Sequence, residues 1–162
     1  MYILDADVFI EAASTYYAFD IAPKFWEILI NLADDNQITS IDFVQTELLR
    51  GNDELATWIE EEFDSAFAST DDTDVSVHYA EIMNWVNDED QYFDYAKADF
   101  ARGADGWIIA YAMAKNLDVV TLERLNPVIK RKVPIPNVCQ NFGISFMDTF
   151  SMLRNLGVQL NP

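Results

Sequence analysis

Four acidic residues stand at the ends of predicted strands or within predicted helices, where an α/β fold can gather functional side chains: Asp5, Glu47, Asp105 and Glu123. Clustered carboxylates repel one another, which raises their pKa values and destabilises a fold unless a cation neutralises them. Oxygen ligands of this kind suit Mg²⁺ or Mn²⁺. Two such ions about 4 Å apart activate a water and stabilise the leaving oxygen in phosphodiester hydrolysis. We therefore take all four residues as candidate catalytic and metal-binding groups.

The remaining residue types support few other kinds of site. The single cysteine, Cys139, excludes an internal disulfide and a multi-thiolate site, and the lone His78 cannot form a multi-histidine zinc site. The five glycines form neither a P-loop nor a dinucleotide fingerprint. A bound metal is therefore expected to be hard and oxygen-ligated, and phosphodiester hydrolysis needs no organic cofactor.

The predicted elements explain how distant acids can converge. Asp5 ends an apolar strand, Glu47 lies within a helix that begins with an Asp42–Gln45 capping box, and Asp105 opens an apolar helix. Glu123 follows a β-branched strand. In open α/β sheets, ligands bind outside the carboxyl ends of the strands. We expect strands at residues 2–5, 38–41, 118–121 and 144–146, and helices at 23–35, 42–50, 55–67, 77–85, 105–116, 138–142 and 149–156.

This order of elements predicts an α/β domain with three layers, α/β/α, around a small central parallel sheet. A chain of 162 residues, 51% of them hydrophobic, is the size of one ordinary domain, so a single domain over residues 1–162 is expected. No apolar run approaches the roughly 18 residues of a membrane span, and no basic region precedes an apolar stretch at the N-terminus. We expect a soluble, cytoplasmic protein.

Charge is unevenly distributed along the chain. The formal net charge is −18, and residues 53–99 carry 15 of the 28 acids with one base, Lys97. Four of the ten bases lie between Arg124 and Lys132. The strongly negative net charge argues against a broad basic surface for nucleic acid. The acidic segment is either a solvated face or a docking surface for a basic partner, and the basic stretch is a candidate cationic lip beside the acids.

Around the acids, the sequence resembles PIN domains. Ile3 to Ile10, with the order Ile-Leu-Asp-Ala-Asp-Val-Phe-Ile, looks like the opening motif of that family. The segments 39–48, 104–110 and 119–123 resemble its second, third and fourth acidic motifs in the same order, and the resemblance extends from Tyr2 to about Phe146. Two positions depart from the pattern: the fourth acid is Glu123 instead of Asp, and Asp7 stands where Asn is common.

The resemblance implies a PIN-like fold and a metal-dependent nuclease that acts on RNA with Mg²⁺ or Mn²⁺. Many small bacterial PIN domains are toxins restrained by a cognate antitoxin, so an antitoxin or another basic protein is an expected partner. A homodimer is a further candidate assembly. The long acidic middle and the proline-rich segment place this chain in a divergent subgroup.

Other interpretations stay open at this point. Asp105 is also suited to a helix N-terminus, where the macrodipole stabilises a carboxylate, and Glu47 and Glu123 taken singly resemble surface acids. Asp5-Ala6-Asp7 also resembles the nucleophile motif of haloacid-dehalogenase-type phosphatases. A PIN fold without activity would be a protein-binding module. Thr121 is a candidate for orienting a ligand, and the aromatic residues Tyr16, Tyr17 and Phe19 are candidates for stacking bases.

Overall fold

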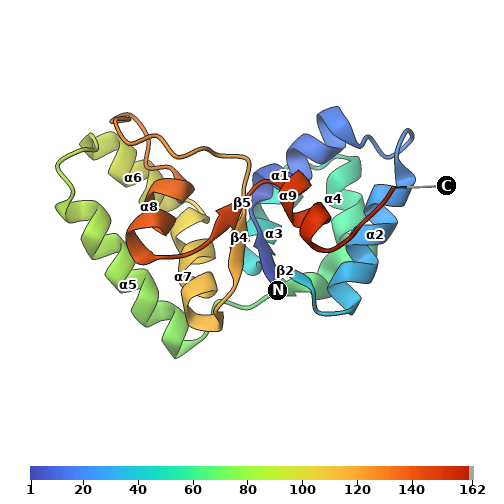
Figure 1. Ribbon diagram of the computed structural model, residues 1–162, viewed down its shortest axis with the longest axis horizontal. Helices are drawn as coiled ribbons and strands as arrows, with labels where there is room; N and C mark the ends of the chain where they lie inside the picture. Colours follow the sequence, from blue (N-terminus) through green and yellow to red (C-terminus); the bar gives the residue numbers. More distant parts are fainter. Residues whose placement is uncertain (161–162) are drawn as a thin grey trace.

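The computed structural model describes residues 1–160, which fold around a parallel sheet with the strand order β3-β2-β1-β4-β5 (Figure 1). Every recorded strand pair is parallel, and Tyr2 of the central strand stands opposite both Ile38 and Asp118. The strands are β1 (Tyr2–Leu4), β2 (Ile38–Ile41), β3 (Phe67–Ala68), β4 (Asp118–Val120) and β5 (Phe146–Met147). Their carboxyl ends therefore meet at one edge of the sheet.

The three central strands are buried on both faces. Ile3, Leu4, Val119 and Val120 are fully buried, and every residue of β2 is buried. Continuous apolar runs of this kind are typical of parallel strands covered by helices on both sides. Burial on both faces fixes the strands in place and leaves their ends as the positions where polar side chains can meet.

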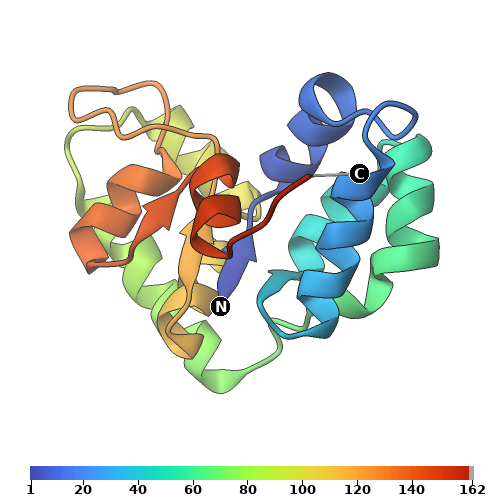
Figure 2. The same cartoon turned by 45° about the vertical axis from the view of Figure 1, so that its right-hand side comes forward.

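Helices form a layer on each side of the sheet (Figures 1 and 2). One layer contains α1 (Ala6–Glu11), α2 (Pro23–Asp34), α3 (Asp42–Leu49) and α4 (Glu54–Trp58). The other contains α5 (Thr73–Asp88), α6 (Asp94–Arg102), α7 (Asp105–Lys115) and α8 (Ile135–Phe142). The final helix is α9 (Thr149–Asn155), which follows β5. The α/β architecture with a small parallel sheet is thus confirmed.

Aromatic stacking holds the first layer together. Pro23 opens α2, as its missing N–H allows, and Phe25, Trp26 and Leu29 form the buried stripe of that helix. The Trp26 ring stacks on Phe19 with 4.1 Å between ring centroids and meets Trp58 edge-on at 4.8 Å. Phe19, one of the residues considered for stacking bases, therefore packs into this layer.

The segment expected as one helix over residues 55–67 is broken into shorter pieces. After α4 the chain forms the π-helical turn η2 (Ile59–Phe63), the 3-10 turn η3 (Asp64–Ala66) and then β3. Apolar residues at helical spacing predicted a helix through Phe67, but this residue forms a strand that pairs with Ser40 of β2. The pairing extends the sheet by one edge strand.

Two further details of the helices differ from the sequence prediction. The capping box at Asp42 is wrong: its carboxylate instead accepts hydrogen bonds from the Thr70 backbone N–H at 3.1 Å and hydroxyl at 2.9 Å, while Gln45 donates to Asp64. Helix α6 was not expected, since most of its apolar residues are alanines and it buries only Ala96 and Phe100. Among the described residues, no helix is long and apolar enough to cross a bilayer.

Candidate metal centre

Three of the four predicted acids converge at the carboxyl edge of the sheet. Asp5 directly follows β1 and caps α1, Asp105 is the first residue of α7, and Glu123 follows β4. One carboxylate oxygen from each residue lies within 4.8 Å of the others. Adjacent parallel strands deliver Asp5 and Glu123, and α7 brings Asp105 to the same edge.

Asp5 is the most deeply buried of these acids, with 6% of its surface exposed. Its Oδ1 accepts a hydrogen bond from the Ala6 N–H at 2.7 Å, and its Oδ2 accepts one from the Thr121 hydroxyl at 3.0 Å. These bonds fix the carboxylate. Burial raises the pKa of Asp5 well above its ordinary value, and the neighbouring charges of Asp7 and Asp105 raise it further.

Asp7 connects this group to the loop after β4. Its Oδ2 accepts a hydrogen bond from the Leu122 N–H at 3.2 Å and lies 3.4 Å from the Thr121 hydroxyl. Its Oδ1 is buried and has no hydrogen-bond partner among residues 1–160. Burial raises the pKa of Asp7, although hydrogen bonds from Asp5 and Leu122 oppose the shift. The residue therefore does more than cap a turn, because one of its oxygens is left for a ligand.

Thr121 orients two of the acids. Its hydroxyl donates to Asp5, and its oxygen accepts the Glu123 backbone N–H at 3.2 Å. A strand-end threonine often only satisfies nearby backbone groups, but here one hydroxyl positions residues that both line the centre. Thr121 is thus a positioning residue for the acid cluster.

Asp105 carries the signature of a repelled carboxylate. Burial and the negative charge of Glu123 raise the pKa of Asp105 to about 7, with Lys132 opposing the shift and Glu47 adding to it. A carboxylate that merely caps a helix has a lowered pKa, because the N-terminal dipole favours the charged form. Helix capping alone therefore does not explain the acid at the start of α7.

Glu123 completes the convergent group and receives a counter-charge. Lys132 Nζ lies 2.5 Å from Glu123 Oε1, whereas Oε2 is buried and has no hydrogen-bond partner in the described part of the chain. The glutamate side chain is 14% exposed and the lysine side chain 55%. Burial lowers the pKa of Lys132, but its contact with Glu123 outweighs burial and raises the pKa overall.

Glu47 stands apart from the other three. It lies on the exposed side of α3 and is outside the group whose oxygens meet within 4.8 Å. Its charge still raises the pKa of Asp105, so it lies near the rim of the centre. The structure therefore gives Glu47 a more distant place than the sequence pattern suggested.

The residues present fit a hard divalent ion. All donors are carboxylate oxygens, and the buried oxygens Asp7 Oδ1 and Glu123 Oε2 lack hydrogen-bond partners within residues 1–160. Unpartnered buried oxygens are costly unless a ligand satisfies them. Together with the mutual repulsion seen in the raised pKa values, this arrangement suits Mg²⁺ or Mn²⁺.

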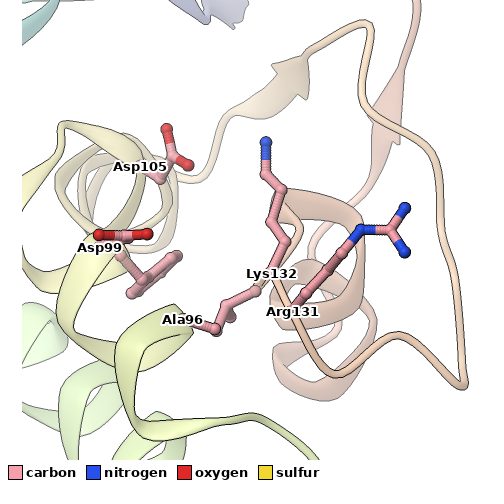
Figure 3. Close-up of a pocket in the computed structure, with 7 residues that line it drawn as sticks. Ala96, Asp99, Asp105, Arg131 and Lys132 are labelled. Carbon is pink, nitrogen blue, oxygen red and sulfur yellow. The ribbon is translucent and has the colours of Figure 1, made fainter.

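Two depressions adjoin the acids. A cavity of about 310 Å³ is lined by Asp105 together with Asp99, Arg131, Lys132 and apolar side chains (Figure 3). A larger groove of about 770 Å³ contacts the centre through Asp7 and Glu123 and continues past Arg124, Tyr16 and Phe150. The centre is therefore reachable from two sides.

Sequence reasoning did not assign Lys132 or Asp7 their places in the site. The run Lys130 to Lys132 was recognisable as basic, but nothing in the sequence distinguishes the lysine that reaches Glu123 from its neighbours. Asp7 stood out as a departure from the PIN pattern. Its hydrogen bond to Leu122 depends on the pairing of β1 with β4, which the sequence alone does not specify.

Comparison with solved structures identifies the fold. The chain is similar to a chain in the crystal structure of VapBC2 from Rickettsia felis, which is bound to a DNA fragment from the VapBC2 promoter. The two chains are 16% identical and superpose with a TM-score of 0.53. The match covers 91% of this chain and 97% of that chain. It is also similar to FitAcB from Neisseria gonorrhoeae, at 16% identity, a TM-score of 0.56 and coverage of 91% and 96%. These matches confirm the PIN-like fold.

No curated protein matches the sequence. A family model does match it, over residues 2–160, nearly the whole of the described structure. On that basis the chain belongs to the family described as "Domain of unknown function (DUF4411)".

Proposed function

We propose that this protein is a metal-dependent ribonuclease that hydrolyses RNA phosphodiester bonds. The observation that carries the proposal is the convergence of Asp5, Asp105 and Glu123 within 4.8 Å at the carboxyl edge of a parallel, PIN-like sheet. Buried acids with raised pKa values are typical of functional sites, since a fold gains no stability from them.

Each acid has a distinct part in this proposal. Asp5, Asp105 and Glu123 would hold Mg²⁺ or Mn²⁺, and Glu47 at the rim would hold water of the ion. Bound there, a divalent ion supplies positive charge for the phosphate and activates water for attack. Thr121 keeps Asp5 and Glu123 in position through its hydroxyl. Asp7 Oδ1 is a further oxygen available to the ion or its water.

The groove beside the centre supports an RNA substrate. Along its length it presents the exposed rings of Tyr16 and Phe150, whose centroids lie 5.9 Å apart, and the cationic side chain of Arg124. Aromatic faces stack unpaired bases, and a nearby cation contacts the backbone. Tyr17 and Phe19 are less suited to this role, because Tyr17 stacks on Phe25 and Phe19 on Trp26 inside the fold.

A toxin role restrained by an antitoxin follows from the PIN resemblance. The acidic segment 53–99 offers an electrostatic surface for a basic antitoxin, since most of its acids are exposed. Growth arrest on expression, relieved by a protein encoded beside it, is the expected behaviour. This part of the proposal is separable from the nuclease chemistry.

A phosphatase of the haloacid-dehalogenase type is less compatible with the site. That chemistry belongs to a different fold, whereas this chain has the fold of the PIN-like structures that it matches. A phosphoaspartyl intermediate at Asp5 would be the observation that restores this alternative.

Cleavage of labelled single-stranded and structured RNAs tests the proposal, with purified protein in Mg²⁺, Mn²⁺ or EDTA. An Asp5→Asn, Asp105→Asn double variant serves as the inactive form, and Asp72→Asn, on the surface away from the centre, as a matched control. Metal-dependent cleavage that the double variant loses and the control keeps supports the nuclease. Cleavage that persists in the double variant would refute the assignment, and the absence of cleavage with any metal would favour a protein-binding module.

A further inference from the structure

Lys132 is the cation that contacts the acid cluster. Its Nζ lies 2.5 Å from Glu123 Oε1, and its charge also acts on Asp105 and Asp5. In Figure 3 the Lys132 side chain extends toward the level of Asp105, whereas the guanidinium of Arg131, which also lines the cavity, points away from Asp105. Neighbouring bases of the same loop thus have opposite orientations, and one of them faces the metal centre.

The loop that carries Lys132 is anchored on both sides. Before it, the Ile129 carbonyl accepts the Gln91 side chain at 2.8 Å and the Lys130 carbonyl accepts the Phe93 N–H at 2.9 Å. After it, Val133 is buried and leads directly into Pro134 and α8. These contacts place the backbone of Lys132 beside the centre, within reach of Glu123.

The charges of the convergent group balance with one divalent ion. Asp5, Asp105 and Glu123 together carry three negative charges when ionised. One ammonium and one divalent ion neutralise them, while a second divalent ion would leave an excess of positive charge among buried groups. The count covers the three acids whose oxygens converge within 4.8 Å, and Asp7 and Glu47 lie outside that group.

We propose that Lys132 takes the place of a second metal ion, so that the centre binds a single divalent ion and the ammonium contacts the phosphate beside it. This inference rests on the proposed nuclease function and changes its two-ion form. In a two-ion site the second ion stabilises charge on the phosphate oxygens. A lysine ammonium is a compact point charge with three donors and can serve that purpose at a fixed position.

The test is a titration of metal-free protein with Mn²⁺, followed by calorimetry for stoichiometry and by electron paramagnetic resonance for spin coupling. We expect one Mn²⁺ per wild-type chain with a mononuclear signal. Lys132→Met should bind two ions with a spin-coupled signal, because the second place is no longer filled. Lys132→Arg keeps the charge and should bind one, and Arg131→Met, which removes an adjacent charge pointing elsewhere, should also bind one.

Each other outcome overturns a defined statement. Two ions in the wild type, or a single ion in Lys132→Met whose circular dichroism and thermal unfolding show a folded protein, would overturn the role of Lys132 and leave the nuclease intact. Two ions in Arg131→Met would show that net charge, and not the Lys132 contact, sets the stoichiometry. No Mn²⁺ bound by the wild type or any variant would instead overturn the proposed metal-dependent function itself.

Discussion

Aspartates occupy two contrasting environments in this protein. At helix N-termini, Asp72 accepts the backbone N–H groups of Asp74 and Val75 and pairs with Lys115, and Asp148 accepts the Ser151 N–H at 2.8 Å. Contact with Lys115 lowers the pKa of Asp72, and the Ser151 hydrogen bond lowers that of Asp148. At the edge of the sheet, burial raises the pKa values of Asp5 and Asp105 instead.

The difference separates acids that stabilise the fold from acids that destabilise it. A capping aspartate is charged, solvated and hydrogen-bonded, so folding favours its ionised form. The clustered aspartates are ionised only at a cost, because they are buried beside other negative charges. Such a cluster needs another reason than stability, and the proposed cation would supply that reason.

The largest expected effect is on catalysis. Asp105→Asn removes a charge that holds the ion while keeping a similar side-chain shape, so metal-dependent RNA cleavage should fall by roughly a hundredfold or more, as a loss of several kcal/mol of metal catalysis implies. Single-turnover rates measure this fall. Asp72→Asn makes the same chemical change at a helix cap and should leave the rate as it is; equal losses in both variants would remove the distinction between the two environments.

The next effect is on the stability of the metal-free protein. The pKa of Asp105 rises from 3.8 in the unfolded chain to about 7 in the fold. Between these pH values the native state binds more protons than the unfolded state. The free energy of unfolding therefore falls as the pH rises from about 4 to about 7. At pH 7.5 in EDTA, Asp105→Asn should therefore unfold at higher urea, with a gain of up to roughly 4 kcal/mol. At pH 4 the two proteins should converge. A variant that is less stable at pH 7.5 would contradict the repulsion.

A smaller effect with the opposite sign is expected at Asp148. Asp148→Ala removes the cap of α9 and should lower the free energy of unfolding by about 1 kcal/mol, whereas Asp148→Asn keeps a capping oxygen, loses only the charge and should cost less than the Ala substitution. The pKa of Asp148 is lower in the fold than in the unfolded chain, so its negative charge stabilises the protein above the unfolded pKa of 3.8. This stabilisation by the charge is lost as the pH falls through the folded pKa. Urea unfolding of the three proteins at pH 7.5 checks the cap, and a costly Asn substitution would argue for a charge role in place of capping.

Much of this arrangement was visible in the sequence because the strands are short, apolar and followed at once by an acid. β2 was predicted with its observed bounds, and Asp5 and Asp105 were placed correctly at a strand end and a helix start. The PIN-like order of the acids then indicated which strand ends meet. The bounds of β2 and the positions of Asp5 and Asp105 depend mainly on hydrophobic periodicity and on the order of elements along the chain, and both can be read from the sequence.

The features that escaped prediction depend on tertiary contacts. β3 consists of two residues inside a helical pattern and exists because Ser40 and Ile41 offer a free strand edge. The distant place of Glu47 depends on how α3 packs, and the contact of Lys132 with Glu123 depends on a loop anchored by Gln91 and Phe93. Such long-range contacts leave no periodic trace in the sequence.

The central claim is that the buried acids at the sheet edge are a divalent metal site. Thermal unfolding of wild type and Asp105→Asn at pH 7.5, with Mn²⁺ or EDTA, tests it most directly. At a hundred times its Kd, Mn²⁺ should stabilise the wild type by about 2.7 kcal/mol, or roughly 5–10 °C in Tm, and should stabilise the variant much less. An equal shift in both proteins, or no shift in the wild type, would contradict the claim.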